Sequence, residues 1–154
     1  MNINDLRRFL IYCGKEGYAT ISEEGMIIES DQSTSIRIKK GDWQYHDNYF
    51  GGEPYGGREV VFYQVKPVWM MTYYGCVGDS VEDLKSVYQH LKKALTLFPA
   101  DAPFRGPKEF TEGNYSYKNR WDGDVEKFSG EEEIYHHNQK IYTAKYIGGV
   151  VDVR

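Results

Sequence analysis

The sequence predicts an α+β fold in which a mainly antiparallel, twisted β-sheet packs against two main helices. Apolar residues recur at helical spacing in two segments, and apolar and polar residues alternate with a period of two in the segments between and after them. Helices and strands are also segregated along the chain, which favours α+β over a parallel α/β fold. A length of 154 residues fits a single α+β domain over residues 1–154.

The first helix is predicted over residues 4–14. Asn4 can cap its N-terminus, and Gly14 and Gly17 are expected to end it, because glycine is common just after the last helical turn. Its apolar side is formed by Leu6, Phe9, Leu10 and Cys13. This spacing predicts that one side of the helix packs on the sheet.

The second helix is predicted over residues 80–98. Ser80 and Asp83 resemble the two ends of a capping box, and Pro99 is expected to stop the helix. An apolar stripe runs along the segment through Val81, Leu84, Tyr88, Leu91, Leu95 and Phe98. These residues step by three and four positions, which is typical of an amphipathic helix.

Two antiparallel hairpins are predicted from the alternating segments. The first joins residues 60–65 to residues 68–74 through a turn near Lys66-Pro67. A loop is expected over residues 101–114. The second hairpin then joins residues 125–135 to residues 141–147 around Asn138.

Aromatic residues make up 16% of the chain and gather between Asp42 and Gly75, together with five of the glycines. Aromatic residues favour strands, and glycine allows tight turns and close backbone approach, so this stretch is expected to be twisted sheet. Both faces of residues 68–74 carry bulky side chains. Some rings are therefore expected to line a pocket or an interface, with Trp43, Tyr45, Trp69 and Tyr73 as the candidate aromatic wall.

Charge and composition exclude several classes of protein. The 19 basic and 23 acidic residues give a net charge of −4, which argues against a surface that binds the nucleic-acid backbone. No apolar run reaches the length of a membrane helix or resembles a signal peptide, so we expect a cytoplasmic protein without a membrane partner. The sequence has no motif for a metal or another cofactor, and we expect neither.

Several short motifs resemble a known family when they are taken together. They are Asp47–Gly52, Gly57–Val61, Pro67–Gly75, Phe104–Pro107, Gly130–Glu132 and Tyr146–Gly149. They resemble an uncharacterised prokaryotic family, classed as a domain of unknown function, that also occurs as the C-terminal part of some Xre/Cro-type helix-turn-helix regulators. The resemblance implies a regulatory or sensing module and brings no catalytic residues with it. No separate helix-turn-helix unit precedes the first predicted helix, so direct DNA binding is not expected.

Three charged residues are candidates for a polar site. Glu59 begins an apolar strand, and a carboxylate that is buried there must be paired or protonated. It could act as a general base or a ligand anchor, because burial raises its pKa, or it could form a salt bridge. Asp47 begins the glycine-rich segment that ends at Glu59. Arg105 lies between two prolines, which suits either recognition of a carboxylate or phosphate or an ion pair with one of the glutamates at 131–133.

Our leading hypothesis is a non-catalytic binding or regulatory module that takes a small ligand or a peptide in an aromatic-lined groove on the antiparallel sheet. The expected ligand-binding residues are Trp43, Tyr45, Asp47, Glu59, Trp69, Tyr73 and Arg105. One alternative is a small enzyme, a hydrolase or a transferase, that uses Glu59 with His46 or Asp47 and with Arg105. Another is a protein–protein interaction or inhibitor protein, which would include a chain that associates into a homo-oligomer.

Overall fold

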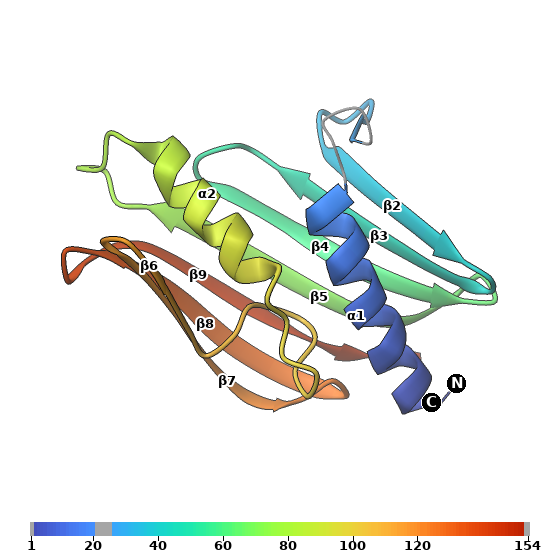
Figure 1. Cartoon of the computed structure of the whole chain (residues 1–154). Coiled ribbons are helices and arrows are strands. Elements are labelled where there is room, and N and C mark those ends of the chain that lie inside the picture. The colour runs from blue at the N-terminus through green and yellow to red at the C-terminus, as the bar shows by residue number, and fades with distance from the viewer. Residues whose placement is uncertain (1, 21–25, 153–154) are drawn as a thin grey trace.

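The fold is a single twisted antiparallel sheet with two helices on one side of it (Figure 1). The computed structural model describes residues 2–20 and 26–152. The helices are α1 (Ile3–Thr20) and α2 (Leu84–Leu95). The strands are β1 (Ile27–Ile28), β2 (Thr34–Lys40), β3 (Trp43–Phe50), β4 (Tyr55–Tyr63), β5 (Lys66–Val77), β6 (Glu109–Glu112), β7 (Tyr115–Asp124), β8 (Lys127–His136) and β9 (Gln139–Val150). The predicted α+β class is confirmed.

The order of the strands is β1-β2-β3-β4-β5-β9-β8-β7-β6, and every neighbouring pair is antiparallel. Each strand from β1 to β4 pairs with the next one in sequence. The chain then crosses through α2 and builds the other half of the sheet from the far edge inwards. The two halves meet where β9 pairs with β5. We call the side that carries α1 and α2 the covered face, and the opposite side the open face (Figure 1).

Helix α1 is longer than predicted, because it contains the two glycines that were expected to end it. The prediction from Gly14 was wrong for a reason of packing. A Cβ atom on Gly14 would lie 2.0 Å from Cε2 of Phe98, so the aromatic ring occupies the space where a side chain would be. Glycine at this position allows residues following α2 to pack closely on α1.

Helix α2 is shorter than predicted and begins four residues later. Its N-cap is Asp83, whose carboxylate accepts a hydrogen bond from the backbone N–H of Ser86 at 3.0 Å. The buried side of the helix comprises Val87, His90, Leu91, Ala94 and Leu95. Val81 and Tyr88 of the predicted stripe pack against the same core cluster, whereas Leu84 is 37% exposed and was wrongly included.

Both predicted hairpins are present, and both have two-residue turns. The β4–β5 turn is formed by Gln64 and Val65, which have φ angles of 48° and 63°, instead of by Lys66-Pro67. The β8–β9 turn is formed by His137 and Asn138, with φ angles of 49° and 64°. Positive φ at both central residues is typical of hairpins whose turn follows the twist of the strands. Strand β6 lies inside the predicted loop over residues 101–114.

Glycines and aromatic residues occur together because they face each other across strands. The register pairs Tyr55 with Gly75, Gly56 with Tyr74, Gly57 with Tyr73, Phe128 with Gly148, and Gly130 with Tyr146. A Cβ atom on Gly130 would lie 2.2 Å from Cζ of Tyr146, and one on Gly56 would lie 3.0 Å from Cδ2 of Tyr74. Each ring therefore lies over the backbone of the neighbouring strand.

We expect Gly130→Ala to destabilise the protein by about 2–3 kcal/mol, because the added methyl group overlaps the Tyr146 ring. The overlap would also disturb the hydrogen bond that the Tyr146 hydroxyl donates to Asn119 at 2.8 Å. Urea unfolding followed by circular dichroism measures the change. Gly52→Ala is the matched control, since nothing lies within 4 Å of its Cβ position. Equal stability of the two variants would contradict this packing.

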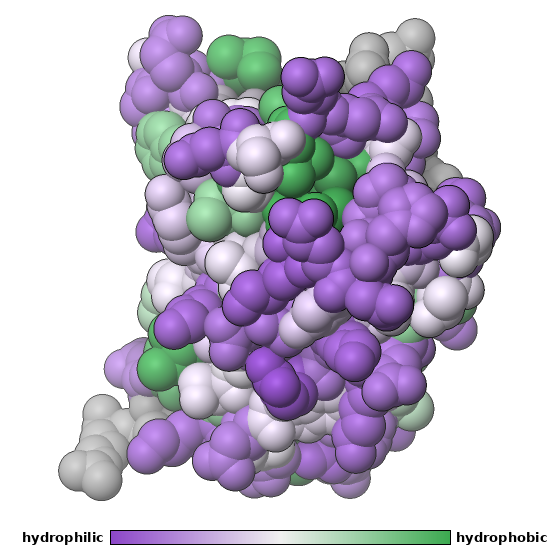
Figure 2. All heavy atoms as spheres, turned by 90° about the vertical axis from the view of Figure 1, so that its left-hand side faces the viewer, coloured by the Kyte–Doolittle hydropathy of each residue, from purple (hydrophilic) through white to green (hydrophobic). Residues whose placement is uncertain are grey.

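The surface of the end that lies at the left of Figure 1 is mostly hydrophilic. Figure 2 shows that hydrophobic residues there are confined to small areas between hydrophilic ones. Within the described part of the chain, neither helix combines the length and apolar character needed to cross a membrane.

Candidate functional site

The structure gathers the predicted site residues at the covered face. Trp43, Tyr45 and Asp47 come from β3, Glu59 from β4, Trp69 and Tyr73 from β5, and Arg105 from the segment between α2 and β6. Trp43 is half-buried and the other six are at most 9% exposed. The rings belong to the core cluster that also contains Leu6, Phe9 and Leu10 of α1. The predicted aromatic wall therefore lies beneath a helix.

Arg105 forms a buried ion pair with Glu132 of β8. Its Nε lies 3.0 Å from Oε1 and its Nη2 lies 2.5 Å from Oε2, so both carboxylate oxygens accept a hydrogen bond. The two side chains are 3% and 0% exposed. The hydroxyl of Tyr117 also donates to Glu132. This bidentate geometry is the strong form of a charge-assisted ion pair. It is the internal pair between Arg105 and one of the glutamates at 131–133 that the sequence suggested as an alternative.

Asp47 and Glu59 form a second buried acidic pair. They lie directly opposite each other on β3 and β4 and are 6% and 5% exposed. Tyr73 donates a hydrogen bond to Asp47 at 2.6 Å. Burial raises the pKa of Asp47 to about 6. Burial and the nearby Asp47 carboxylate raise the pKa of Glu59 to about 8, against the opposing effect of Arg105. At neutral pH Glu59 therefore holds a proton.

The space next to Glu59 is very small. A cavity of about 10 Å³ is lined by Leu10, Cys13, Gly14, Tyr45, Glu59, Phe98 and Pro103. This volume holds about one water molecule. Burial also raises the pKa of the Cys13 thiol, which therefore remains protonated. A ligand larger than water would enter only if α1 or the segment around Phe98 moved.

His46 is separated from the acidic pair by the sheet. Its neighbours Tyr45 and Asp47 point to the covered face, so by the alternation of a strand His46 points to the open face. There its Nε2 lies 3.0 Å from Oγ of Ser35. Of the four residues in the enzyme hypothesis, the structure therefore places Asp47, Glu59 and Arg105 at the covered face. His46 lies on the open face.

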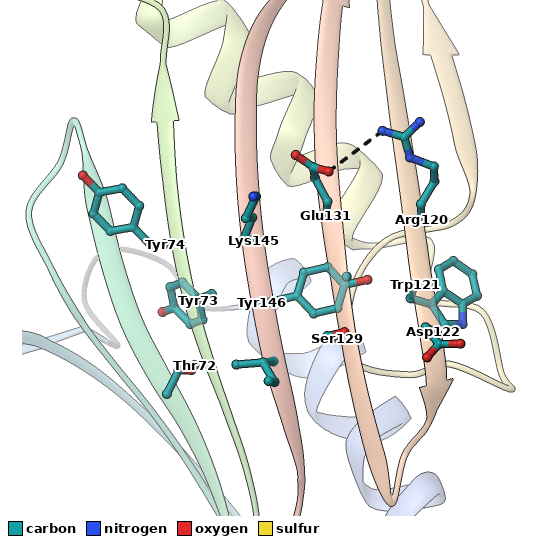
Figure 3. Close-up of a pocket in the computed structure, with 12 residues that line it drawn as sticks. Thr72, Tyr73, Tyr74, Arg120, Trp121, Asp122, Ser129, Glu131, Lys145 and Tyr146 are labelled. Atoms are coloured by element: carbon teal, nitrogen blue, oxygen red, sulfur yellow. Dashed lines mark ion pairs between the residues drawn. The ribbon is translucent and has the colours of Figure 1, made fainter.

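A wide, shallow groove lies on the open face (Figure 3). It has a volume of about 760 Å³ and extends over β5, β9, β8 and β7. Its floor carries two rows of directly paired residues, which are Tyr74–Lys145–Glu131–Arg120 and Thr72–Ile147–Ser129–Asp122. Of the seven predicted residues, Tyr73 also borders this groove.

The groove combines exposed apolar side chains with charged groups. Tyr74 is 59% exposed and Ile147 is 62% exposed. Nη2 of Arg120 lies 3.1 Å from Oε2 of Glu133 and 4.0 Å from Oε2 of Glu131. Figure 3 shows the pair with Glu131 as a dashed line. Lys145 stands between Tyr74 and Glu131 in Figure 3, and no carboxylate among the described residues lies within 4.0 Å of its Nζ. Its charge is therefore available to a partner.

The sequence-based prediction named Trp69 and Tyr73 from this strand and missed Tyr74, which the structure places in the groove. Tyr74 follows Tyr73 directly, and adjacent strand residues point to opposite faces. Alternation along β5 puts Trp69 and Tyr73 on one face and Thr72 and Tyr74 on the other. The signal was present, but the sequence does not say which face the helices cover.

A family model described as a domain of unknown function (DUF5680) matches residues 47–151. The chain belongs to the DUF5680 family. The match begins at Asp47 in β3 and ends just after β9, so in this DUF5680 chain it covers the acidic pair, the Arg105–Glu132 ion pair and the whole groove. Comparisons with curated proteins and with solved structures found no match. Membership of a family of unknown function agrees with the resemblance noted from the sequence motifs.

Proposed function

We propose that this DUF5680 chain is a non-catalytic binding module that takes an extended peptide segment in the open-face groove. The observation that carries the proposal is the groove of about 760 Å³ on a sheet face with exposed Tyr74 and Ile147. Small-ligand pockets usually enclose most of their ligand. This groove is shallow and spans four strands, about 14 Å at the usual strand spacing, which favours a peptide or a loop of a partner protein.

The proposal includes a regulatory role, which is implied by the resemblance to a family that also occurs as the C-terminal part of some Xre/Cro-type regulators. In that role, binding of the segment would report the presence of a partner protein in the cytoplasm. The net charge of −4 supports recognition of protein over nucleic acid.

Selection from a random peptide library on the immobilised full chain tests the proposal. We expect enriched peptides, and we expect titration to shift NMR signals of β5, β9, β8 and β7 more than those of α1. Ile147→Glu should weaken binding at least tenfold, because it places a charge on the apolar floor. Val65→Glu is the matched control, since Val65 is 80% exposed at the β4–β5 turn. Absence of enrichment, or equal effects of the two variants, would argue against the groove.

A small enzyme is the second candidate, and the acidic pair favours it. Carboxyl groups with raised pKa values occur often at catalytic sites, and Arg105 lies at the same face as Asp47 and Glu59. Catalysis there would require the cavity of about 10 Å³ to open. A panel of ester, amide and phosphoester substrates assayed with the wild type and Glu59→Gln tests it, and hydrolysis that the substitution abolishes would support the enzyme.

A further inference from the structure

The open-face groove carries balanced charges, although the whole chain is acidic. Its lining includes two cations, Lys145 and Arg120, and two carboxylates, Asp122 and Glu131, so that their charges cancel. The chain as a whole has a net charge of −4. Two copies of the chain therefore meet less electrostatic repulsion at this face than their net charges alone would suggest. Whether they attract each other depends on the order of the charges.

The first row of the groove floor is complementary to its own reverse. The row runs Tyr74–Lys145–Glu131–Arg120 across β5, β9, β8 and β7. When a second copy of the row is laid on it in the opposite direction, Lys145 meets Glu131 and Tyr74 meets Arg120. The first contact is a salt bridge, and the second places a guanidinium on an aromatic ring, which is also attractive. Each contact occurs twice.

The second row follows the same rule. It runs Thr72–Ile147–Ser129–Asp122 over the same four strands. Laid on its own reverse, the row brings the hydroxyl of Thr72 to the carboxylate of Asp122, to which it can donate a hydrogen bond. It also brings Ile147, which is 62% exposed, onto the small side chain of Ser129. The exposed apolar surface of the groove is thereby covered.

One symmetry operation produces this reversal. A two-fold axis that lies in the interface and runs parallel to the strands, between β9 and β8, puts β9 of one copy over β8 of the other and β5 over β7. Both copies then use the same patch, as in an isologous dimer. An axis perpendicular to the strands would put β9 over β9, where Lys145 finds no carboxylate, because β9 (Gln139–Val150) contains no acidic residue.

The shape of the face allows the same arrangement. Sheets that stack face to face lie about 10 Å apart with their strands within about 30° of each other. The lysine and glutamate side chains are long enough to meet across that distance. The sheet is twisted, as Figure 1 shows, so its face has the form of a saddle. A saddle keeps its shape after a half-turn about an axis along the strands, so the two faces fit each other.

We propose that a second copy of this chain covers the groove, in a two-fold dimer in which β9 of each copy packs over β8 of the other. The contact spans four strands, about 14 Å, which is small for a stable interface, so the dimer is weak and reversible. The peptide of the proposed function needs the same floor. Self-association therefore competes with peptide binding and regulates it, a consequence that rests on the proposed function, whereas the dimer does not.

Sedimentation equilibrium of the full chain, from about 10 µM to about 1 mM, tests the inference. We expect a monomer–dimer equilibrium that shifts toward monomer as salt is added. Lys145→Glu and Glu131→Lys should each weaken the dimer at least tenfold, because each puts like charges opposite each other twice. Lys66→Glu is the matched control: it changes the net charge as Lys145→Glu does, but Lys66 is exposed at the β4–β5 turn and does not line the groove.

Mixing the two charge variants gives the most specific result. Neither Lys145→Glu nor Glu131→Lys should form dimers by itself, but an equimolar mixture should form heterodimers. In that mixture two carboxylates of one chain face two ammonium groups of the other. Arg120 keeps its ion pair with Glu133 at 3.1 Å in both variants. Recovery of dimers on mixing would also show that both variants are folded.

The outcomes separate this inference from the proposed function. A wild type that stays monomeric over the whole range, or a mixture that forms no heterodimer, would overturn the dimer and leave the peptide library as the test of the proposed function. Dimers that respond to the variants as expected support the inference, even if the library yields no peptide and the proposed function falls. If the library does yield groove-binding peptides, adding one should shift the wild type toward monomer.

Discussion

Arg105→Met is expected to destabilise the protein by about 3–5 kcal/mol. The substitution keeps an unbranched apolar stem but removes the only cation that bonds Glu132 among the described residues. Glu132 is fully buried, and its carboxylate would keep only the hydrogen bond from Tyr117. A buried charge without a counter-charge is costly, so the folded state weakens or Glu132 takes up a proton. Urea unfolding at pH 7 measures the loss.

Neutralising both partners should recover much of that loss. In Arg105→Met/Glu132→Gln neither of these two positions carries a buried charge, and the Gln carbonyl can still accept the Tyr117 hydrogen bond. We expect the double variant to be more stable than Arg105→Met by about 2 kcal/mol. Arg120→Met is the matched control: Arg120 also pairs with a glutamate but is 71% exposed, so its loss should cost at most about 1 kcal/mol. Equal costs for the two single variants would show that burial of the Arg105 pair is not decisive.

Glu59→Gln is expected to stabilise the protein above neutral pH. The pKa of Glu59 is raised from 4.5 to about 8, so the folded chain keeps a proton that the unfolded chain releases. This carboxyl group therefore makes the wild type lose stability as pH rises from about 4.5 to about 8, with no further loss above that range. Glutamine does not titrate. The variant should be the more stable of the two by about 2–4 kcal/mol at pH 8 and show a flatter profile.

Urea unfolding of both proteins between pH 4.5 and pH 9 tests this expectation. Glu131→Gln on the open face is a suitable control, since its side chain is 36% exposed and the loss of stability that Glu59 causes should remain in this variant. Asp47→Asn should flatten a lower part of the profile, because burial raises the pKa of Asp47 to about 6. Parallel profiles for the wild type and Glu59→Gln would mean that Glu59 is ionised in the folded protein at neutral pH.

Much of the local structure was predictable because it depends on neighbouring residues. Helical spacing located α1 and α2, and alternation located both hairpins. Alternation also placed Trp43, Tyr45 and Asp47 on one face of a strand, since they are two residues apart. The helix bounds were less predictable. Gly14 lies inside α1 because of Phe98, a residue 84 positions away whose position depends on tertiary packing.

The candidate sites were likewise predictable only in the parts that depend on neighbouring residues. By itself, the sequence determined the α+β class, the period of each segment and the division of each strand into two faces, because these follow from backbone geometry over a few residues. Only the tertiary structure decided that the helices cover the Trp69 and Tyr73 face, that Asp47 opposes Glu59, and that Glu132 pairs with Arg105. The same holds for the groove, which exists because β9 returns to pair with β5. Such contacts depend on which distant segments bury the most apolar surface together, and no local pattern encodes that choice.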